Sequence, residues 1–307
     1  MDYSSDIGQA THPAPRPRTL QSVLSSLAHG AEYRVLRSMA HSRALATEEE
    51  LDAVADRITP EAFEAGVRKC QKVLERFRRN IPLDPALSYL DMGCGQGELT
   101  IALARSGLSD VTGVDFLPRF VKRAQAYAAA YGLAERIDFV CQNLHAWTPP
   151  RRYDVLLSFD VFEHIENPQA FLRRMHDFVA PGGSAVLAFG PLFHSPFGDH
   201  SGGYFRFQMP WRGVLFSEDA MLRVRKECYR PTDPARHWGE IAGGLNLMRY
   251  SQFLEHVRST GWRFRYLSVN TFLQRSPALQ AVSDVVMRLP RVQDYFAHNV
   301  YCVLKQA

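Results

Sequence analysis

Three glycines alternate within one short stretch of the chain, at Gly93, Gly95 and Gly97. An apolar run over 87–90 precedes them, and a helix-like run over 99–105 follows. A strand that turns sharply into a helix needs glycine where the backbone bends or approaches a ligand, and the helix then offers unpaired N–H groups. Asp115 follows Gly95 by about twenty residues, a distance at which a carboxylate can accept hydrogen bonds from ribose hydroxyls. This spacing predicts a nucleoside-binding site.

A second group of residues that could do chemistry follows an apolar run over 153–159. Asp160, Glu163 and His164 are close enough in sequence to point acid and imidazole groups into one cleft at the end of a strand. Three roles are open: a general base or positioning group for an acceptor molecule, a set of ligands for a divalent metal, or a structural role. Because imidazole titrates near neutral pH, His164 is suited to proton removal. We assign no residue as a metal ligand.

The segment over 190–247 holds the third group. It is rich in glycine, proline, aromatic residues and histidine, and it shows no clear strand pattern. A long irregular insertion inside a compact domain is usually functional or mobile. Because it directly follows a predicted strand, we expect it to reach the acceptor side of the pocket, with His194 or His200 as a base or a ligand. The alternative is an ordered loop whose aromatic side chains cap the sheet.

Apolar runs that predict strands alternate with helix-like segments through the rest of the chain. The strands are predicted over 87–91, 111–115, 136–141, 153–159, 185–189, 262–269 and 299–304. The intervening helices are predicted over 99–106, 119–131, 167–179, 248–260 and 277–289. This alternation predicts an α/β fold with a doubly wound parallel sheet.

The chain before the sheet divides into two parts. Residues 1–18 contain several prolines and little that could pack, so we expect a disordered tail. Over 19–80, apolar residues recur at three-to-four spacing and predict helices, which either add packing to the sheet or form a lid that closes over a ligand. We therefore expect a tail over 1–18, an N-terminal helical lid over 19–80, and a main domain over 81–307 that contains the insertion over 190–247.

The composition is that of an ordinary globular protein, with 46% hydrophobic and 22% charged residues. No apolar run approaches the roughly 18 residues needed to span a membrane, and the N-terminus lacks the apolar segment of a secretory signal. The five cysteines are scattered and lack CxxC spacing, so we expect reduced thiols in a cytoplasmic protein without a membrane partner.

Basic residues are densest between the predicted lid and the sheet, although the net charge is only +4. The cluster comprises Arg68, Lys69, Lys72, Arg76, Arg78 and Arg79. It is either a solvated helix face or a patch for nucleic acid or an acidic substrate. Because no nucleic-acid-binding motif accompanies it, we expect no nucleic-acid partner.

The motif Asp91-x-Gly93-x-Gly95-x-Gly97 after a strand resembles the first motif of the class I S-adenosylmethionine-dependent methyltransferases. It differs from the common dinucleotide fingerprint, whose third glycine falls one position later. Further segments that resemble this family follow in the family's order, at 113–115, 116–117, 142–144, 153–165 and 180–183. The segment over 153–165 resembles the small-molecule branch of the family.

The resemblance implies a Rossmann-like seven-stranded sheet that is mostly parallel with an antiparallel last strand. It also implies S-adenosyl-L-methionine as cofactor and S-adenosyl-L-homocysteine as product. By the resemblance, Asp91 lies near the methionine end of the cofactor, Asp115 holds the ribose, and Phe116 lies against adenine. The family often has Asp where this chain has Asn143. The residues expected to contact the cofactor are Asp91, Gly93, Gly95, Asp115, Phe116, Asn143, Leu144, Asp160 and, from the lid, Tyr33.

Three functions remain open. The first is transfer of a methyl group to an oxygen or nitrogen of a small molecule such as a secondary metabolite, with His164, His194 or His200 assisting deprotonation. The second is intramolecular cyclisation of the cofactor, which would release methylthioadenosine. The third is a non-catalytic methyltransferase-like subunit that binds a partner. The lid and the insertion favour an enclosed small acceptor, and we expect a monomer or homodimer.

Overall fold

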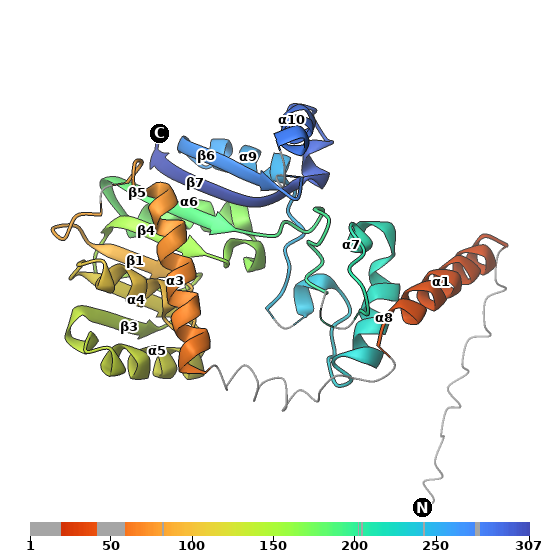
Figure 1. Cartoon of the computed structure of the whole chain (residues 1–307), viewed down its shortest axis with the longest axis horizontal. Coiled ribbons are helices and arrows are strands. Elements are labelled where there is room, and N and C mark those ends of the chain that lie inside the picture. Colours follow the sequence, from red (N-terminus) through yellow and green to blue (C-terminus); the bar gives the residue numbers. More distant parts are fainter. Residues whose placement is uncertain are drawn as a thin grey trace, which may run out of the picture.

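The computed structural model describes residues 20–41, 59–81, 83–201, 203, 205–241, 243–273 and 277–307. The predicted tail over 1–18 and the part of the predicted lid over 42–58 lie outside the described residues. Among the described residues, a central sheet carries helices on both faces, and a smaller helical lobe lies beside the sheet (Figure 1). No helix in these ranges is both long enough and apolar enough to cross a membrane.

The sheet contains seven strands among the described residues, in the spatial order β3-β2-β1-β4-β5-β7-β6. They are β1 (Tyr89–Met92), β2 (Val111–Asp115), β3 (Ile137–Cys141), β4 (Tyr153–Phe159), β5 (Val179–Phe189), β6 (Trp262–Thr271) and β7 (Ala297–Gln306). Strands β1 to β5 pair in parallel, whereas β7 pairs antiparallel with β5 and β6. The predicted doubly wound sheet with an antiparallel last strand is confirmed. Its carboxyl-terminal edge is where ligands bind in open α/β sheets.

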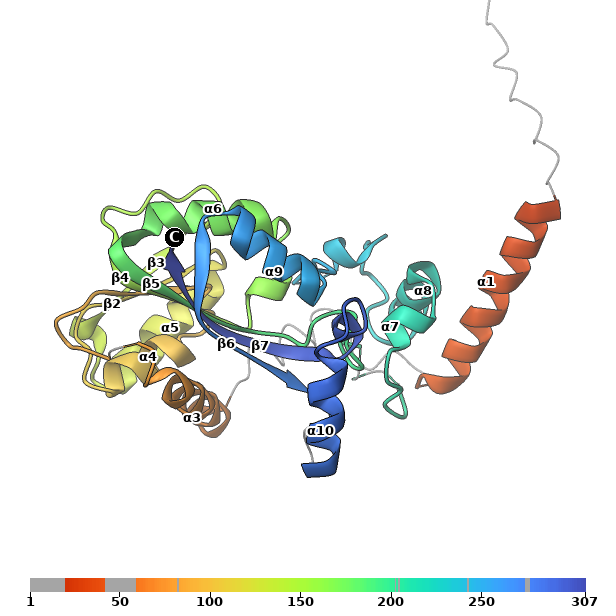
Figure 2. The same ribbon diagram turned by 90° about the horizontal axis from the view of Figure 1, so that it is seen from above.

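Helices cover both faces of the sheet, which explains why β1 and β2 are buried along their whole length (Figure 2). One face carries α3 (Pro60–Phe77), α4 (Glu98–Arg105) and α5 (Pro118–Ala130). The other face carries α6 (Pro168–Phe178) and α9 (Tyr250–Ser259). A further helix, α10 (Pro277–Val286), lies between β6 and β7 in the chain.

The two described helices of the predicted lid pack in different places. In α3, the apolar side chains Phe63, Val67, Leu74 and Phe77 are buried in the same core as α4. In contrast, α1 (Leu20–Met39) packs against α8 (Glu218–Cys228), where Leu36 and Met221 share one apolar cluster. In this structure α3 is therefore a layer of the sheet domain, and α1 belongs to the helical lobe. Closure of either helix over a ligand stays a prediction.

The insertion after β5 forms the helical lobe. It contains α7 (Arg212–Leu215), α8 and the 3-10 helix η4 (Trp238–Glu240), around a small apolar core of its own. Arg212 and Asp199 form an ion pair of 2.9 Å whose side chains are 1% and 3% exposed. The Arg212 guanidinium also lies 3.8 Å above the Phe205 ring. An ion pair this well enclosed costs several kcal/mol to leave with one partner missing, so it fixes how the lobe packs.

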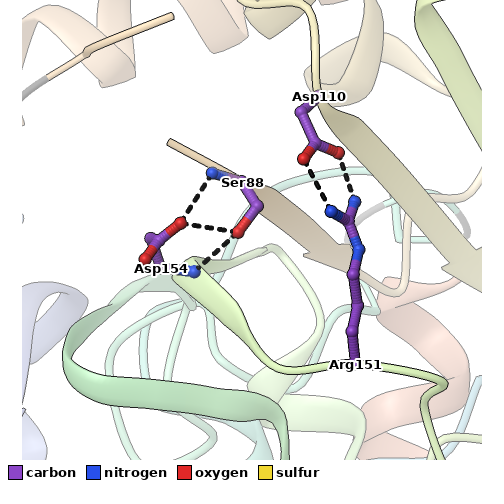
Figure 3. A network of polar contacts seen from close by, with 4 residues as sticks. All are labelled: Ser88, Asp110, Arg151 and Asp154. Carbon is purple, nitrogen blue, oxygen red and sulfur yellow. Dashed lines mark hydrogen bonds and ion pairs between the residues drawn. The ribbon is translucent and has the colours of Figure 1, made fainter. Parts of the chain in front are cut away.

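Polar contacts at the amino-terminal edge join β1 to β4 (Figure 3). The Ser88 N–H and hydroxyl donate to the Asp154 carboxylate at 2.9 and 2.7 Å, and the Asp154 N–H donates to Ser88 Oγ at 3.0 Å. These hydrogen bonds hold the pKa of Asp154 below its ordinary value. Nearby, Arg151 forms an ion pair with Asp110, just ahead of β2. The contacts fix the relative positions of strands whose opposite ends carry the candidate site.

Candidate functional site

The glycine turn joins β1 to α4 at the carboxyl-terminal edge of the sheet. Gly93 has a φ angle of 80°, in a region that glycine enters without steric penalty. A Cβ atom at this position would lie 2.7 Å from Val161 Cγ2, so crowding also excludes a side chain. The N–H groups of Gly93 and Cys94 donate to the Val114 carbonyl at 2.8 and 2.9 Å, which ties the turn to β2.

Asp115 lies at the end of β2 and holds the turn from its other side. Its Oδ2 accepts from the Gly95 N–H at 3.0 Å, and its Oδ1 accepts from the Leu117 N–H at 2.9 Å. The side chain is therefore oriented before any ligand arrives. Since each carboxylate oxygen has a second lone pair, Asp115 can still accept from two hydroxyls of a ligand.

A cavity of about 620 Å³ opens beside this turn, and we refer to it as the large cavity. Its lining includes the predicted residues Gly93, Asp115, Phe116, Asn143, Leu144, Asp160 and His164. Gly239, Gly243 and Gly244 of the helical lobe close another wall. The Phe116 side chain is 64% exposed, which is high for a large apolar group and typical of a surface that receives a ligand.

Asn143 follows β3 and lines the same cavity. Its Oδ1 accepts from the His145 N–H at 2.9 Å, a local turn that fixes the side chain. The amide NH₂ group has no hydrogen-bond partner within the described ranges and can donate to a ligand. The change from the Asp common in the family thus replaces an acceptor with a donor at this position.

Asp160 follows β4 in a left-handed backbone conformation, with a φ angle of 55°. Such a conformation is costly for a residue other than glycine and often occurs at functional sites. The Asp160 carboxylate accepts from Lys69 Nζ at 2.7 Å, and both side chains are more than half exposed. This pair could not be predicted from local sequence patterns, because Lys69 lies on α3, far from Asp160 in the chain.

Glu163 lies in the 3-10 helix η2 (Phe162–His164) and is 4% exposed. Its Oε1 accepts from the Gly190 N–H at 3.0 Å, at the point where the insertion begins. Its Oε2 is buried and has no hydrogen-bond partner in the described part of the chain. Burial raises the pKa of Glu163 to about 7. Glu163 thus anchors the insertion and does not line the large cavity.

Two of the three predicted histidines lie together. His164 lines the large cavity, and its Nδ1 lies 2.6 Å from the Gly244 carbonyl. Since a carbonyl only accepts, Nδ1 carries the proton and Nε2 of the neutral ring keeps a lone pair. The His200 ring meets the His164 ring edge-on, with 5.6 Å between centroids. The described residues contain no group of three or more His, Cys, Asp or Glu side chains that could hold a metal ion.

A second, smaller cavity of about 290 Å³ adjoins the same edge of the sheet, and we call it the small chamber. Asp160 lines both cavities, so they meet at this residue. The chamber is also lined by Lys69, by Pro191 of the insertion and by His298 of β7. His298 Nδ1 lies 2.9 Å from Ser195 Oγ, and burial lowers the pKa of its imidazole.

The chain resembles known methyltransferases in sequence. Residues 61–212 match the family model described as a methyltransferase domain. A ubiquinone biosynthesis O-methyltransferase of Methylobacterium nodulans is 42% identical over 107 residues, which cover 34% of this chain and 41% of the relative. A trans-aconitate 2-methyltransferase of Streptomyces avermitilis is 32% identical over 117 residues, which cover 38% of this chain and 43% of the relative. The chain thus spans less than half the length of these relatives.

The chain belongs to the class I S-adenosylmethionine-dependent methyltransferases. A solved structure assigned as a sarcosine dimethylglycine methyltransferase of Galdieria sulphuraria shares the fold, with a TM-score of 0.50 and 14% identity. The likeness covers 78% of this chain and 86% of that chain. The family accounts for the order of the motifs around the large cavity, whereas Asp160 is the only predicted cofactor contact among the described residues that line the small chamber.

The Asp91 side chain lies beneath the glycine turn, away from the large cavity. Its side chain is 1% exposed and does not line the large cavity. Its Oδ2 accepts from the Thr100 hydroxyl at 2.6 Å, which connects β1 to α4 beneath the glycine turn. Burial raises the pKa of Asp91 to about 7. In this structure Asp91 supports the turn, and its expected position at the methionine end of the cofactor stays a prediction.

Tyr33 and His194 lie away from the cavities of the methyltransferase. The Tyr33 hydroxyl donates to Glu227 of α8 at 2.6 Å, and the expected contact with the methionine part of the cofactor stays a prediction. The His194 ring lies 6.0 Å from the Tyr295 ring and lines neither cavity. Burial lowers the pKa of His194. Periodicity predicted the helix of Tyr33, but it could not predict the surface against which the helix packs.

Proposed function

We propose that this methyltransferase transfers the methyl group of S-adenosylmethionine to an oxygen or nitrogen atom of a small molecule. The observation that carries the proposal is the Asp115 carboxylate, oriented by the Gly95 and Leu117 N–H groups at the wall of the large cavity. Relatives named for O-methylation in ubiquinone biosynthesis and for methylation of trans-aconitate support it.

The residues around the large cavity fit the parts of S-adenosylmethionine. The free lone pairs of Asp115 suit a ribose diol, and the exposed Phe116 ring offers an apolar wall for adenine. The Asn143 amide can donate to the edge of the base. Since the glycines of the turn carry no side chains, the methionine part can approach the backbone closely at these positions. When bound, the cofactor supplies a methyl group already activated by a positively charged sulfur.

We assign the small chamber to the acceptor, because it meets the large cavity at Asp160. Methyl transfer is an in-line displacement, so most of the rate enhancement comes from holding the acceptor atom opposite the sulfur. Phe189, Pro191 and Tyr301 provide the apolar walls that exclude water from this point. The Asp160 carboxylate, held by Lys69, adds a fixed negative charge where the two ligands meet.

His164 is the residue we assign to proton removal from the acceptor. The Gly244 carbonyl fixes the proton on its Nδ1, so the Nε2 lone pair is available for a proton. The His200 ring limits how the His164 ring can turn. His298 lines the small chamber together with Asp160 and is the competing base, which the sequence did not single out.

Product analysis tests the proposed function directly. The purified protein would be incubated with S-adenosylmethionine and a panel of hydroxylated and amino small molecules. Release of S-adenosylhomocysteine with a methylated acceptor is the expected result. Release of methylthioadenosine would support the intramolecular cyclisation instead, and a failure to bind S-adenosylhomocysteine would support a non-catalytic subunit. A cytoplasmic location, a monomeric or homodimeric state and the absence of a nucleic-acid partner remain predictions.

A further inference from the structure

One side of α3 carries the basic residues Arg68, Lys69, Lys72 and Arg76, at the spacing that aligns side chains on a helix. Together with Tyr301 of β7 they line a hollow of about 380 Å³, which we call the basic hollow. The remaining lining residues, Ala65 and Val73, are apolar, so no acidic side chain contributes to this wall. The hollow is therefore positively charged and has an apolar floor.

Arg76 is held in place by neutral partners. Its Nη2 donates to Ser268 Oγ at 2.8 Å and to Asn270 Oδ1 at 3.0 Å. Its guanidinium also lies 4.0 Å above the centre of the Tyr301 ring. These contacts fix the side chain without neutralising its charge. A fixed guanidinium loses little conformational entropy when it binds an anion.

Two other cations of the basic hollow are weakly compensated. Lys72 is exposed and has no ion-pair partner within the ranges that the structure describes. Arg68 lies 3.5 Å from Glu64, but Glu64 also accepts from Arg105 at 2.8 Å and from Tyr131 at 2.7 Å. The negative charge of Glu64 is thus shared among three donors. An anion in the hollow would find positive charge that the protein itself compensates only in part.

The basic hollow adjoins the small chamber. Lys69, Val73 and Tyr301 line both of them. Lys69 also bonds to Asp160, the residue at which the chamber meets the large cavity. A molecule that enters through the hollow would therefore place one end among the α3 cations and the other end beside Asp160.

We propose that the basic hollow binds a carboxylate or phosphate group of the acceptor and thereby selects anionic acceptors. The inference rests on the proposed function, because it identifies the molecule entering the hollow as the acceptor of methyl transfer. The α3 cations would hold the anionic group, and the nucleophilic atom at the other end of the molecule would reach the point where Asp160 separates the two cavities.

Binding of simple probes tests this proposal without knowledge of the natural acceptor. The full chain, saturated with S-adenosylhomocysteine, would be titrated with benzoate, phenyl phosphate and the neutral benzamide. At low salt we expect at least one anion to bind roughly tenfold more tightly than benzamide and to weaken as salt is added. The tighter of the two anions identifies a carboxylate or a phosphate as the preferred group.

A pair of double variants with equal loss of charge locates the site. R68A/K72A removes two cations of the hollow, whereas R78A/R79A removes two cations near the end of the same helix that do not line it. R68A/K72A is expected to weaken the binding of the anion by roughly tenfold, and R78A/R79A is expected to weaken it by less than about twofold. Affinity for S-adenosylhomocysteine should be unchanged in both variants.

Several results would overturn the proposal. Equal affinity for benzoate, phenyl phosphate and benzamide would show that the positive charge of the hollow does not contribute to binding. Equal losses of anion affinity in the two variants would indicate only a general electrostatic attraction to the protein. Weaker S-adenosylhomocysteine binding in R68A/K72A would assign the hollow to the cofactor carboxylate. Tight binding of an oligonucleotide that both variants lose would assign the cations to nucleic acid. If the unaltered protein fails to bind S-adenosylhomocysteine, the proposed function fails, whereas titration of the protein alone still tests the anion site.

Discussion

The two cavities that meet at Asp160 are built in different ways. The large cavity is formed mostly by residues at the ends of adjacent parallel strands and the turns that follow them, such as Gly93, Asp115 and Asn143. The small chamber takes some residues from the ends of β4 and β5, but most of its lining comes from α3, from the start of the insertion and from the antiparallel β7. The first is therefore fixed by the sheet, and the second depends on how separate elements pack on it.

This difference indicates which part of the site can vary in chemistry. A cavity fixed by β1, β2 and β4 keeps its shape as long as the sheet forms. A chamber whose walls come from α3, the insertion and β7 can change its lining without disturbing the sheet. We therefore expect cofactor recognition and acceptor recognition to respond separately to substitution, and the following predictions test that separation.

The largest effect is expected for His164→Gln. Loss of the proton acceptor should lower kcat about a hundredfold or more, while affinity for S-adenosylhomocysteine changes little. His194→Gln is the matched control, because His194 lines neither cavity. If His298→Gln lowers kcat and His164→Gln does not, the base is His298 in the small chamber.

A somewhat smaller effect is expected for Gly93→Ala, which alters only the large cavity assigned to the cofactor. The positive φ angle and the contact with Val161 should together weaken the binding of S-adenosylhomocysteine by roughly tenfold or more, as measured by calorimetry. Gly107→Ala is the control, since Gly107 has a φ angle of 93° but no atom within 4 Å of an added Cβ. It should cost stability but leave the affinity unchanged. Equal affinities for Gly93→Ala and the unaltered protein would contradict a close approach of the ligand.

Glu163→Gln tests the contact that anchors the start of the insertion. We expect this contact to make the stability of the protein depend on pH. Because the folded-state pKa of about 7 is above the ordinary 4.5, the stabilising contribution of neutral Glu163 is complete below pH 4.5 and is lost as pH rises through 7. The unaltered protein should therefore lose about 2 kcal/mol more free energy of unfolding than the variant between pH 5 and pH 8. Denaturant titrations at both pH values measure this difference. Parallel pH curves would show that Glu163 is ionised normally.

The smallest effect is expected for Tyr33→Phe. The exposed hydrogen bond to Glu227 should contribute less than about 1 kcal/mol, and the affinity for S-adenosylhomocysteine should not change. Thermal unfolding and calorimetry measure the two quantities. A loss of cofactor affinity would show that α1 moves to the large cavity when ligand binds, as the lid interpretation expects.

The cofactor side could be predicted from the sequence because its signals are local. The β2 and β4 strands occur at their predicted bounds, and Asp115 meets Gly95 as the spacing requires. The pairing of Lys69 with Asp160 could not be predicted, since it depends on where α3 packs. His298 was missed for the same reason, and the packing of Tyr33 against α8 was not predicted because periodicity does not identify the packing partner of a helix.

The insertion shows the same limit. Its composition predicted an irregular segment, yet it contains α8 and a small core in which Trp238 and Met221 pack with Leu36 of α1. These apolar residues are far apart in sequence and become a core only when the chain brings them together. His200 likewise contacts His164 only because the fold brings distant segments together. No local sequence pattern distinguishes His200 from His194.

We infer that Asp115 binds the cofactor at the large cavity. The most direct test of this inference is calorimetric titration of S-adenosylhomocysteine into the unaltered protein, Asp115→Ala and Asp110→Ala. The Asp110 variant removes an equal charge at the opposite edge of the sheet, where it pairs with Arg151 (Figure 3). We expect Asp115→Ala to weaken binding by roughly tenfold or more and Asp110→Ala to leave it unchanged. Equal affinity of Asp115→Ala and the unaltered protein would contradict the account.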